Sequence, residues 1–176
     1  MKALFLDRDG TLMLNVPYLS DPEKVELFPG VAESLKKAQD LGYLLFLFTN
    51  QSGIGRGYYT LEDAVACNTK LIELIGLGED VFAEVCIAPE APDAEQVYRK
   101  PSPKFILEMI AKHSLDPEAC VIVGDRIADV NAGKNAGIKR VYINSGNCSE
   151  EGEEADAVEA GAMVFPSFAA FMAAQE

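Results

Sequence analysis

The chain has 176 residues, of which 49% are hydrophobic and 24% charged, so it has a globular composition and is long enough to bury a core. Fifteen Lys and Arg residues against 28 Asp and Glu residues give a formal net charge of −13, which argues against a general nucleic-acid binder or a protein of acidic membrane surfaces. We therefore expect one domain over residues 1–176, with neither nucleic acid nor a membrane as partner.

No part of the sequence is predicted to export the protein or to anchor it. The apolar run at the N-terminus ends at Asp7, and the most apolar stretch, residues 43–48, is far shorter than the roughly 18 residues of a spanning helix. The cysteines are scattered without a CxxC pair, which is typical of reduced, mostly buried thiols and predicts a cytoplasmic protein. They are Cys67, Cys86, Cys120 and Cys148.

Strands and helices are predicted to alternate through the first half of the chain. Short apolar runs indicate buried strands, and stretches rich in proline and glycine indicate loops. Thr60 and Asp63 have the spacing of a helix-capping box. The predicted elements are strands over 3–6 and 43–48, helices over 31–40 and 60–75, and loops over 10–29 and 49–57.

The alternation continues in the second half. Strands are predicted over 81–88, 120–123, 140–143 and 162–165, and helices over 103–113, over 128–136 and at the C-terminus. Residues 149–161, with Glu150, Glu151, Glu153 and Glu154, are predicted to be a solvated loop or loose helix. Apolar strands that alternate with helices favour an α/β fold, a Rossmann-like parallel sheet with helices on both faces.

Two aspartates directly follow the first predicted strand. Asp7 and Asp9 are two residues apart on an extended segment, so we expect both carboxylates to face one reacting centre while Arg8 faces away. Open parallel sheets bind their ligands at the carboxyl ends of the strands. A functional site is therefore predicted at the end of this strand.

The other predicted strands also lead to polar groups suited to phosphate chemistry. The second is followed by Thr49, the third leads to Arg99 and Lys100, and the fourth ends at Asp125, with Asp129 one helical turn later. Clustered carboxylates favour Mg²⁺, and a lysine can neutralise a phosphoryl group. The pattern therefore predicts a magnesium-dependent site for phosphoryl transfer.

The two aspartates of the first strand can divide the chemistry between them. Asp7 can attack phosphorus and form a phospho-aspartate. Asp9 can protonate the leaving alkoxide and then take a proton from water, which typically contributes roughly 10²–10⁴-fold. Asp129 also fits an ordinary acid in the first turn of a helix, stabilised by the helix dipole, so its role stays open at this point.

The order of these residues resembles the four motifs of the haloacid dehalogenase (HAD) superfamily of phosphatases. The resemblance implies that Asp7 is the nucleophile and Asp9 the acid/base, and that Thr49 and Lys100 bind the phosphoryl group. It further implies that the metal is Mg²⁺. Its ligands in the resemblance are Asp7, the main-chain carbonyl of Asp9, and Asp125, with Asp129 supporting the metal site.

A closer resemblance, over about residues 3–145, is to D,D-heptose 1,7-bisphosphate phosphatases and the related histidinol-phosphate phosphatases. It is carried by residues 5–11, 49–54, 56–57, 99–101 and 123–125. The resemblance implies a set of substrate contacts from three loops. They are Asn15, Tyr18, Asn50, Gln51, Ser52, Arg56 and Arg99.

One stretch departs from that family. The relatives carry a zinc-binding loop with one histidine and three cysteines before the Arg-Lys-Pro, whereas residues 86–98 of this chain retain only Cys86, so we expect no zinc. Residues 10–29 and 88–101 are predicted to be loops alone. The resemblance then implies a minimal cap, without a cap domain, and an open active site.

The leading hypothesis is a phosphomonoester hydrolase, a monomer or small homo-oligomer, that acts on a sugar phosphate such as D-glycero-D-manno-heptose 1,7-bisphosphate. Histidinol phosphate or another small phosphomonoester is the first alternative. A phospho-acceptor signalling domain also combines acidic residues, Thr and Lys with Mg²⁺, but its acceptor aspartate closes the third strand, where this chain has Pro89 and Glu90. An inactive binder on the same fold is disfavoured by the intact acidic residues and lysine.

Overall fold

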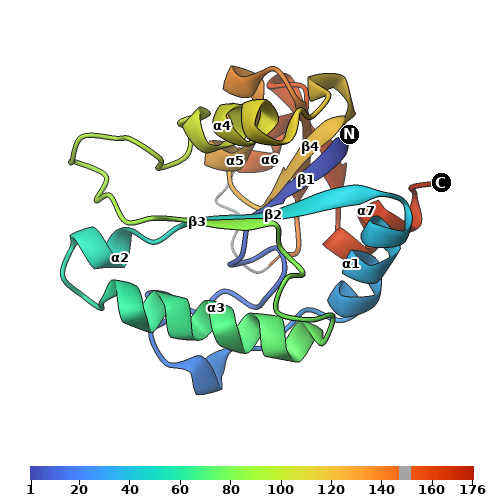
Figure 1. Ribbon diagram of the computed structural model, residues 1–176. Helices are drawn as coiled ribbons and strands as arrows, with labels where there is room; N and C mark the ends of the chain where they lie inside the picture. Colours follow the sequence, from blue (N-terminus) through green and yellow to red (C-terminus); the bar gives the residue numbers. More distant parts are fainter. Residues whose placement is uncertain (147–151) are drawn as a thin grey trace.

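Six parallel strands form one central sheet in the computed structural model, which describes residues 1–146 and 152–176 (Figure 1). The strand order is β3-β2-β1-β4-β5-β6, so the predicted α/β fold with a parallel, Rossmann-like sheet is confirmed. The strands are β1 (Lys2–Leu6), β2 (Tyr43–Asn50), β3 (Glu84–Ala88), β4 (Cys120–Gly124), β5 (Lys139–Ile143) and β6 (Met163–Phe165).

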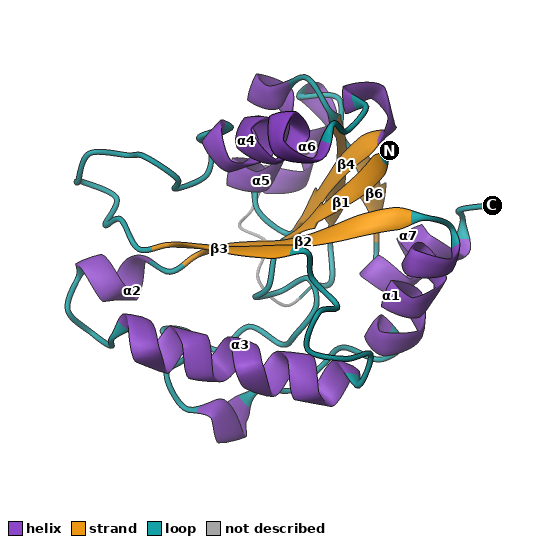
Figure 2. Ribbon diagram, viewed as in Figure 1, coloured by secondary structure: helices purple, strands orange, loops and turns teal. Residues whose placement is uncertain are grey.

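Helices cover both faces of this sheet (Figure 2). Helices α1, α3 and α7 pack on one face, and α4, α5 and α6 on the other. The helices are α1 (Val31–Asp40), α2 (Ser52–Gly55), α3 (Leu61–Ile75), α4 (Lys104–His113), α5 (Ile127–Ala136), α6 (Glu153–Glu159) and α7 (Phe168–Ala173), with 3-10 turns η1 (Pro22–Lys24) and η2 (Pro117–Ala119).

Alternation along the strands divides the core into two layers, one on each face of the sheet. Leu4 and Leu6 of β1 face α1, α3 and α7, whereas Phe5 faces the layer of α4 and α5. Phe5 stacks on Phe46 of β2 with ring centroids 4.9 Å apart, and Phe105 of α4 meets Phe5 edge-on at 6.1 Å. Because helices cover both faces of the sheet, successive residues of these strands are buried, which explains their continuous apolar sequences.

The predicted element boundaries differ from the structure mainly around the second and third strands. β2 continues to Asn50 because Thr49 and Asn50 pair with β3, and α2 occupies part of the predicted loop 49–57. β3 begins at Glu84 rather than residue 81. Val81 and Phe82 are buried but precede the ladder, so their burial and not strand pairing accounts for the apolar run.

Other sequence predictions are met closely. The capping box is present, since the Thr60 hydroxyl accepts the N–H of Asp63 and the Asp63 carboxylate accepts the N–H of Thr60. Within residues 10–29 the only regular element is η1, and residues 89–103 contain no helix or strand, so the described residues hold no cap domain at either position. Cys148 and residues 149–151 of the predicted acidic segment lie outside the described residues.

The connections reverse direction in the middle of the sheet. The chain runs outward from β1 through β2 to β3, then returns to place β4 on the other side of β1. Such a switch point opens a crevice at the carboxyl ends of the two central strands. None of the described helices combines the length and apolar character that a membrane span requires.

Candidate active site

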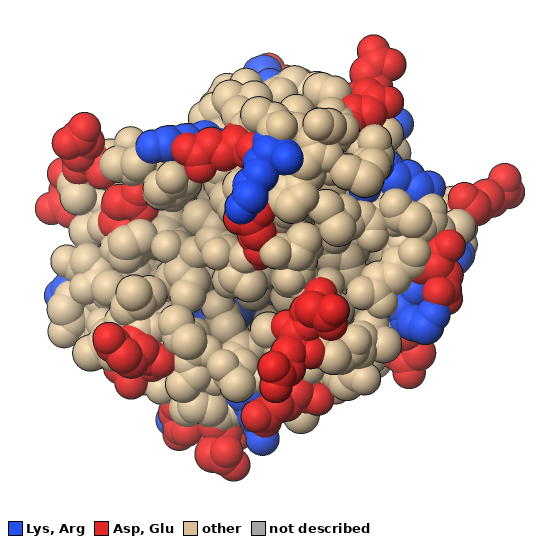
Figure 3. All heavy atoms as spheres, in the orientation of Figure 1, with Lys and Arg blue, Asp and Glu red and all other residues tan. Residues whose placement is uncertain are grey.

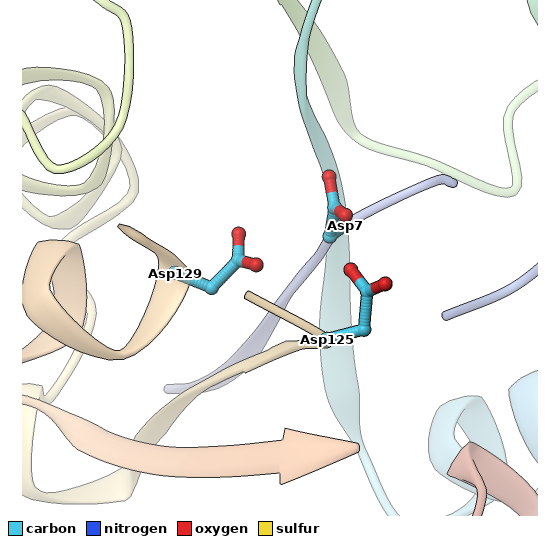
Figure 4. Close-up of side chains that lie close together, drawn as sticks. All are labelled: Asp7, Asp125 and Asp129. Carbon is cyan, nitrogen blue, oxygen red and sulfur yellow. The ribbon is translucent and has the colours of Figure 1, made fainter. Parts of the chain in front are cut away.

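Three buried carboxylates converge at the switch point between β1 and β4. Asp7 follows β1, Asp125 follows β4, and Asp129 lies in the first turn of α5. The three side chains point toward one another (Figure 4), with one oxygen of each within 4.8 Å of the others. Asp7 and Asp125, which were predicted to follow strands, and Asp129, one helical turn after Asp125, are thus brought together in space.

Lys100 lies among these carboxylates. Its ammonium is 2.7 Å from Asp7 Oδ1 and 2.5 Å from Asp129 Oδ1, and it donates to the carbonyl oxygen of Phe48 at 2.7 Å. The Asn50 side chain fixes the main chain of Lys100 from both sides, since its amide donates to the Lys100 carbonyl and its oxygen accepts the Lys100 N–H. Lys100 is therefore held in place independently of any ligand.

Burial and mutual repulsion perturb the acidic groups strongly. Burial raises the pKa of Asp7 to about 7, against the lowering effect of Lys100 and with further increases from Asp129 and Asp9. Burial, then the charges of Asp7 and Asp129, raises the pKa of Asp125 to about 9. Burial alone would lower the pKa of Lys100, but Asp129 and Asp7 raise it above its usual value, so Lys100 stays charged. One ammonium thus faces three carboxylates.

This arrangement fits a divalent cation. Asp125 Oδ1 is buried and has no hydrogen-bond partner among the described residues, although a carboxylate oxygen in that position needs one. Asp129 Oδ2, in contrast, is occupied by the main-chain N–H of Arg126 at 3.1 Å. Hard carboxylate oxygens and the excess negative charge are the conditions that Mg²⁺ favours.

Two glycines leave room for the carboxylates. Gly10 has a φ of +78°, and a Cβ at this position would lie 2.0 Å from Asp125 Oδ2. A Cβ at Gly124 would lie 2.2 Å from the Asp129 side chain. The glycine that follows Asp9 and the one that precedes Asp125 are therefore required by close approach of the carboxylates.

Asp9 belongs to a second cluster, and here the prediction that Arg8 faces away is wrong. β1 ends at Leu6 and the chain bends, so the alternation of an extended strand no longer applies. The Arg8 guanidinium donates to both carboxylate oxygens of Asp9, from Nε to Oδ2 at 3.0 Å and from Nη2 to Oδ1 at 3.2 Å. The third donor, Nη1, reaches Asn68 Oδ1 of α3 at 2.9 Å.

The far side of Asp9 is closed by a chain of side-chain hydrogen bonds. Gln51 Nε2 donates to Asp9 Oδ2 at 2.9 Å and to Thr49 Oγ1 at 2.8 Å, and the Thr49 hydroxyl lies 3.4 Å from Asp9 Oδ2. The Tyr59 hydroxyl donates to Gln51 Oε1 at 2.6 Å. Gln51, predicted as a substrate contact, is 4% exposed and points its amide at Asp9 and Thr49.

A pocket of about 450 Å³ opens above both clusters. Most of the residues predicted for the site line it, whereas Thr49 and Arg56 do not: Thr49 is fully buried and Arg56 is exposed. The predicted residues that line the pocket are Asp7, Asp9, Asn15, Tyr18, Asn50, Gln51, Ser52, Arg99, Lys100, Asp125 and Asp129.

Comparisons with known proteins agree with this geometry. A family model described as HAD-hydrolase-like matches residues 97–171. The D-glycero-beta-D-manno-heptose-1,7-bisphosphate 7-phosphatase of Helicobacter pylori is 41% identical over 140 residues, which cover 78% of this chain and 80% of that protein. The corresponding alpha-anomer phosphatase of Photorhabdus laumondii is 36% identical over 151 residues, which cover 81% of this chain and 82% of that protein.

The chain belongs to the heptose bisphosphate phosphatase family of HAD-like hydrolases. A crystal structure of the D,D-heptose 1,7-bisphosphate phosphatase from B. bronchiseptica, complexed with magnesium and phosphate, superposes with a TM-score of 0.85. The match covers 98% of this chain and 97% of that chain at 24% identity, and it shows the shared fold. The resemblance carried by the four sequence motifs is thereby confirmed.

This member of the heptose bisphosphate phosphatase family organises the loop before Lys100 with side-chain hydrogen bonds. Glu90 Oε1 accepts the main-chain N–H groups of Val97 at 3.0 Å and Tyr98 at 2.7 Å. Gln96 Nε2 donates to the carbonyl oxygen of Ala91 at 2.9 Å. These bonds close the loop directly before Arg99. The prediction that the protein contains no zinc stays a prediction.

The sequence does not predict the contacts of two residues that line the pocket, Arg8 and Glu153. Strand alternation predicts that Arg8 faces away from the site, but Arg8 lines the pocket and donates to Asp9. Composition predicts that Glu153 belongs to a solvated acidic run, but Glu153 is 6% exposed. Its Oε1 accepts the Arg126 Nε–H at 3.0 Å and the Ile127 N–H at 2.9 Å. The run is therefore not uniformly solvated, because one of its members caps α5 beside the site.

Proposed function

We propose that this protein is a Mg²⁺-dependent phosphatase that removes the 7-phosphate of a D-glycero-D-manno-heptose 1,7-bisphosphate through a phospho-aspartate. The observation that carries the proposal is the buried cluster of Asp7, Asp125, Asp129 and Lys100 at the switch point of the sheet. The names of the relatives in Helicobacter pylori and Photorhabdus laumondii support the substrate.

Asp7 is the proposed nucleophile. A carboxylate oxygen of Asp7 attacks phosphorus while the bond from phosphorus to the sugar oxygen breaks, which leaves a phosphoryl group on Asp7. The ion pair with Lys100 fixes the orientation of Asp7 at the floor of the pocket. We assign phosphoryl binding to Lys100 and, from its motif, to Thr49, whose hydroxyl is engaged with Gln51 and Asp9.

Asp9 is the proposed acid and base. It gives a proton to the sugar oxygen as that oxygen leaves, and then takes a proton from the water that attacks the phosphorylated Asp7. The Asp9 side chain is 21% exposed, so it has access to the pocket where both oxygens would lie. Hydrolysis releases phosphate and restores the Asp7 carboxylate.

Asp7 and Asp125 would hold Mg²⁺ together with the main-chain carbonyl of Asp9, and Asp129 would support this site. When bound, the cation supplies positive charge that favours the ionised carboxylates and neutralises the phosphoryl group. The buried, unpartnered Asp125 Oδ1 supports the assignment.

The second phosphate of the substrate needs positive charge that the surface as a whole lacks. Acidic side chains are spread over the face shown in Figure 3, in keeping with the net charge of −13. Arg99 lines the pocket, and burial followed by the charge of Arg56 lowers its pKa. We assign the phosphate that is not cleaved to Arg99 and, on the resemblance alone, to Arg56, which is exposed and does not line the pocket. We assign the sugar to Asn15, Tyr18, Asn50, Gln51 and Ser52.

We further propose that the protein acts as a single domain on this small phosphorylated substrate, in the cytoplasm, as a monomer or small homo-oligomer. Cys67, Cys86 and Cys120 are buried free thiols, which suits a compartment that keeps thiols reduced.

The test is phosphate release from both anomers of the heptose bisphosphate and from histidinol phosphate, with Mg²⁺ and with EDTA. We expect Mg²⁺-dependent turnover of the bisphosphate and none in the Asp7→Asn variant. Preferential turnover of histidinol phosphate would reassign the substrate within the same chemistry. Turnover of none of these esters would reject the proposed substrate class.

A further inference from the structure

Arg8 is a buried charge beside the active site for which the proposed mechanism has no role. Its side chain is completely buried, although arginine is almost never fully buried unless it is paired. The pairing partner is Asp9, and the two N–H···O bonds form a parallel fork. Such a bidentate contact fixes the plane of a carboxylate as well as its distance.

Each of the three nitrogens of the Arg8 guanidinium donates a hydrogen bond within the protein. Nε and Nη2 donate to Asp9, and Nη1 donates to Asn68 of α3. A guanidinium committed in this way is poorly placed to bind the phosphoryl group, for which Lys100 already supplies a charge beside Asp7. The geometry therefore connects Arg8 to the chemistry through Asp9.

The two oxygens of Asp9 are held unequally. Oδ2 receives Arg8 Nε and Gln51 Nε2 and lies 3.4 Å from the Thr49 hydroxyl, whereas Oδ1 receives Arg8 Nη2. Oδ2 is therefore surrounded by protein donors, whereas Oδ1 has only one donor from the protein and can form a further hydrogen bond. An acid must present one defined oxygen to the leaving group within hydrogen-bond reach.

We propose that Arg8 is a positioning residue that orients the Asp9 carboxylate toward the leaving oxygen, with Asn68 anchoring the guanidinium. The inference rests on the proposed role of Asp9 as acid and base. Misplacing a reacting group by about 1 Å can cost about 100-fold in rate, so a loss of the fork should reduce turnover without comparable loss of binding.

The first experiment is a double-mutant cycle on the heptose bisphosphate with Arg8→Lys and Asp9→Asn. Arg8→Lys keeps a positive charge but loses the fork, and we expect kcat to fall about 10- to 100-fold with KM changed less than about 3-fold. In the Asp9→Asn background the same substitution should lower kcat by less than about 3-fold, because the residue it acts through is gone.

The leaving group gives an independent readout. An aryl phosphate loses its phenolate without needing a proton. First-turnover release of the phenolate should therefore fall far less in Arg8→Lys than release of heptose 1-phosphate from the bisphosphate. Equal losses with both leaving groups, or additive losses in the cycle, would show that Arg8 supports the fold or the phosphoryl group directly.

Two further variants keep the test decisive. If Arg8→Lys does not fold, as judged by thermal unfolding, Asn68→Ala leaves the fork in place and removes its anchor, and we expect a smaller kcat loss with the same leaving-group dependence. Arg140→Lys, away from the pocket, is the control and should retain wild-type kcat.

The two proposed roles fail in different ways. If Asp9→Asn releases heptose 1-phosphate as fast as the wild type, the acid/base role of Asp9 itself is rejected. If Asp9→Asn loses this release while Arg8→Lys keeps it, only the positioning role of Arg8 is rejected.

Discussion

At the scale of single residues, the site brings together buried acidic groups that repel one another. Asp7, Asp125 and Asp129 are all buried, and Lys100 offers a single positive charge to them. A buried charge without compensation costs several kcal/mol of folding free energy, about 3–5 kcal/mol when a partner is removed. The site is thus expected to be less stable empty than filled, which two substitutions can show.

Asp125→Asn should stabilise the metal-free protein. The pKa of Asp125 is raised from 3.8 to about 9, so the folded state retains a proton that the unfolded state has lost, and stability falls as pH rises between these values. Replacing Asp125 removes that fall, so the advantage of the variant in EDTA should grow from about pH 4 to about pH 9. Urea unfolding across this range measures it.

The same variant should lose the stabilisation that Mg²⁺ gives the wild type. Asp80→Asn, at an exposed position, is the matched control and should alter neither quantity. An Asp125→Asn protein that is less stable than the wild type in EDTA throughout this pH range would contradict the account of the acidic cluster.

Lys100→Met should destabilise the metal-free protein by about 3–5 kcal/mol, because it leaves Asp7 and Asp129 without their buried counter-charge. Mg²⁺ should recover part of this loss, and turnover should stay abolished. Lys104→Met removes a lysine that is 46% exposed, contacts Glu108 at 4.0 Å and lies 4.7 Å from the centre of the Tyr98 ring. Because these contacts are at the surface, this substitution should change stability little. Equal effects of the two substitutions on urea unfolding would argue against the buried counter-charge.

At the scale of elements, the loop before Lys100 shows how hydrogen bonds can order a long segment. Glu90 accepts the N–H groups of Val97 and Tyr98, directly before Arg99 and Lys100. Burial opposes ionisation of Glu90, but the hydrogen bonds from the main chain outweigh it and lower the pKa of Glu90. The ionised carboxylate is therefore the form that holds the loop closed.

Glu90→Gln should loosen the loop and raise the KM for the bisphosphate more than it lowers kcat, because Arg99 rather than the nucleophile is displaced. Limited proteolysis should cut the loop faster in this variant, while Glu95→Gln in the same loop should behave as the wild type. An unchanged KM and cleavage rate in Glu90→Gln would show that the loop is ordered by other contacts.

The same loop should depend on pH in the wild type. It should loosen as pH falls through the lowered pKa of Glu90, since protonation removes the negative charge that accepts the main-chain N–H groups.

At the scale of the whole molecule, one sheet supplies the proposed metal ligands from elements far apart in the chain. Asp7 follows β1 and Asp125 follows β4, so the cation should stabilise the folded state as a unit. Mg²⁺ at about 100 times its Kd should add about 2.7 kcal/mol to the free energy of unfolding. Thermal unfolding should stay a single transition that Mg²⁺ moves upward. A second transition that Mg²⁺ leaves in place would contradict one cooperative domain.

Much of this architecture is predictable from the sequence because strands buried on both faces leave continuous apolar runs. Helix α1 and the start of α3 follow from periodicity and capping, and parallel strands bring Asp7 and Asp125 to one edge. The position of the Arg8 side chain was not predictable, because strand alternation ends where the backbone bends. Burial of Glu153 likewise depends on tertiary contact with α5, which composition does not reveal.

Trapping the phosphorylated enzyme tests the proposed phospho-aspartate most directly. The protein is mixed with Mg²⁺ and heptose 1,7-bisphosphate, quenched in acid during turnover, digested and analysed by mass spectrometry. We predict a phosphoryl group on the peptide that contains Asp7, and none on the Asp7→Asn protein. Steady turnover without any phosphorylated peptide, or a phosphoryl group on another residue, would contradict Asp7 as the nucleophile.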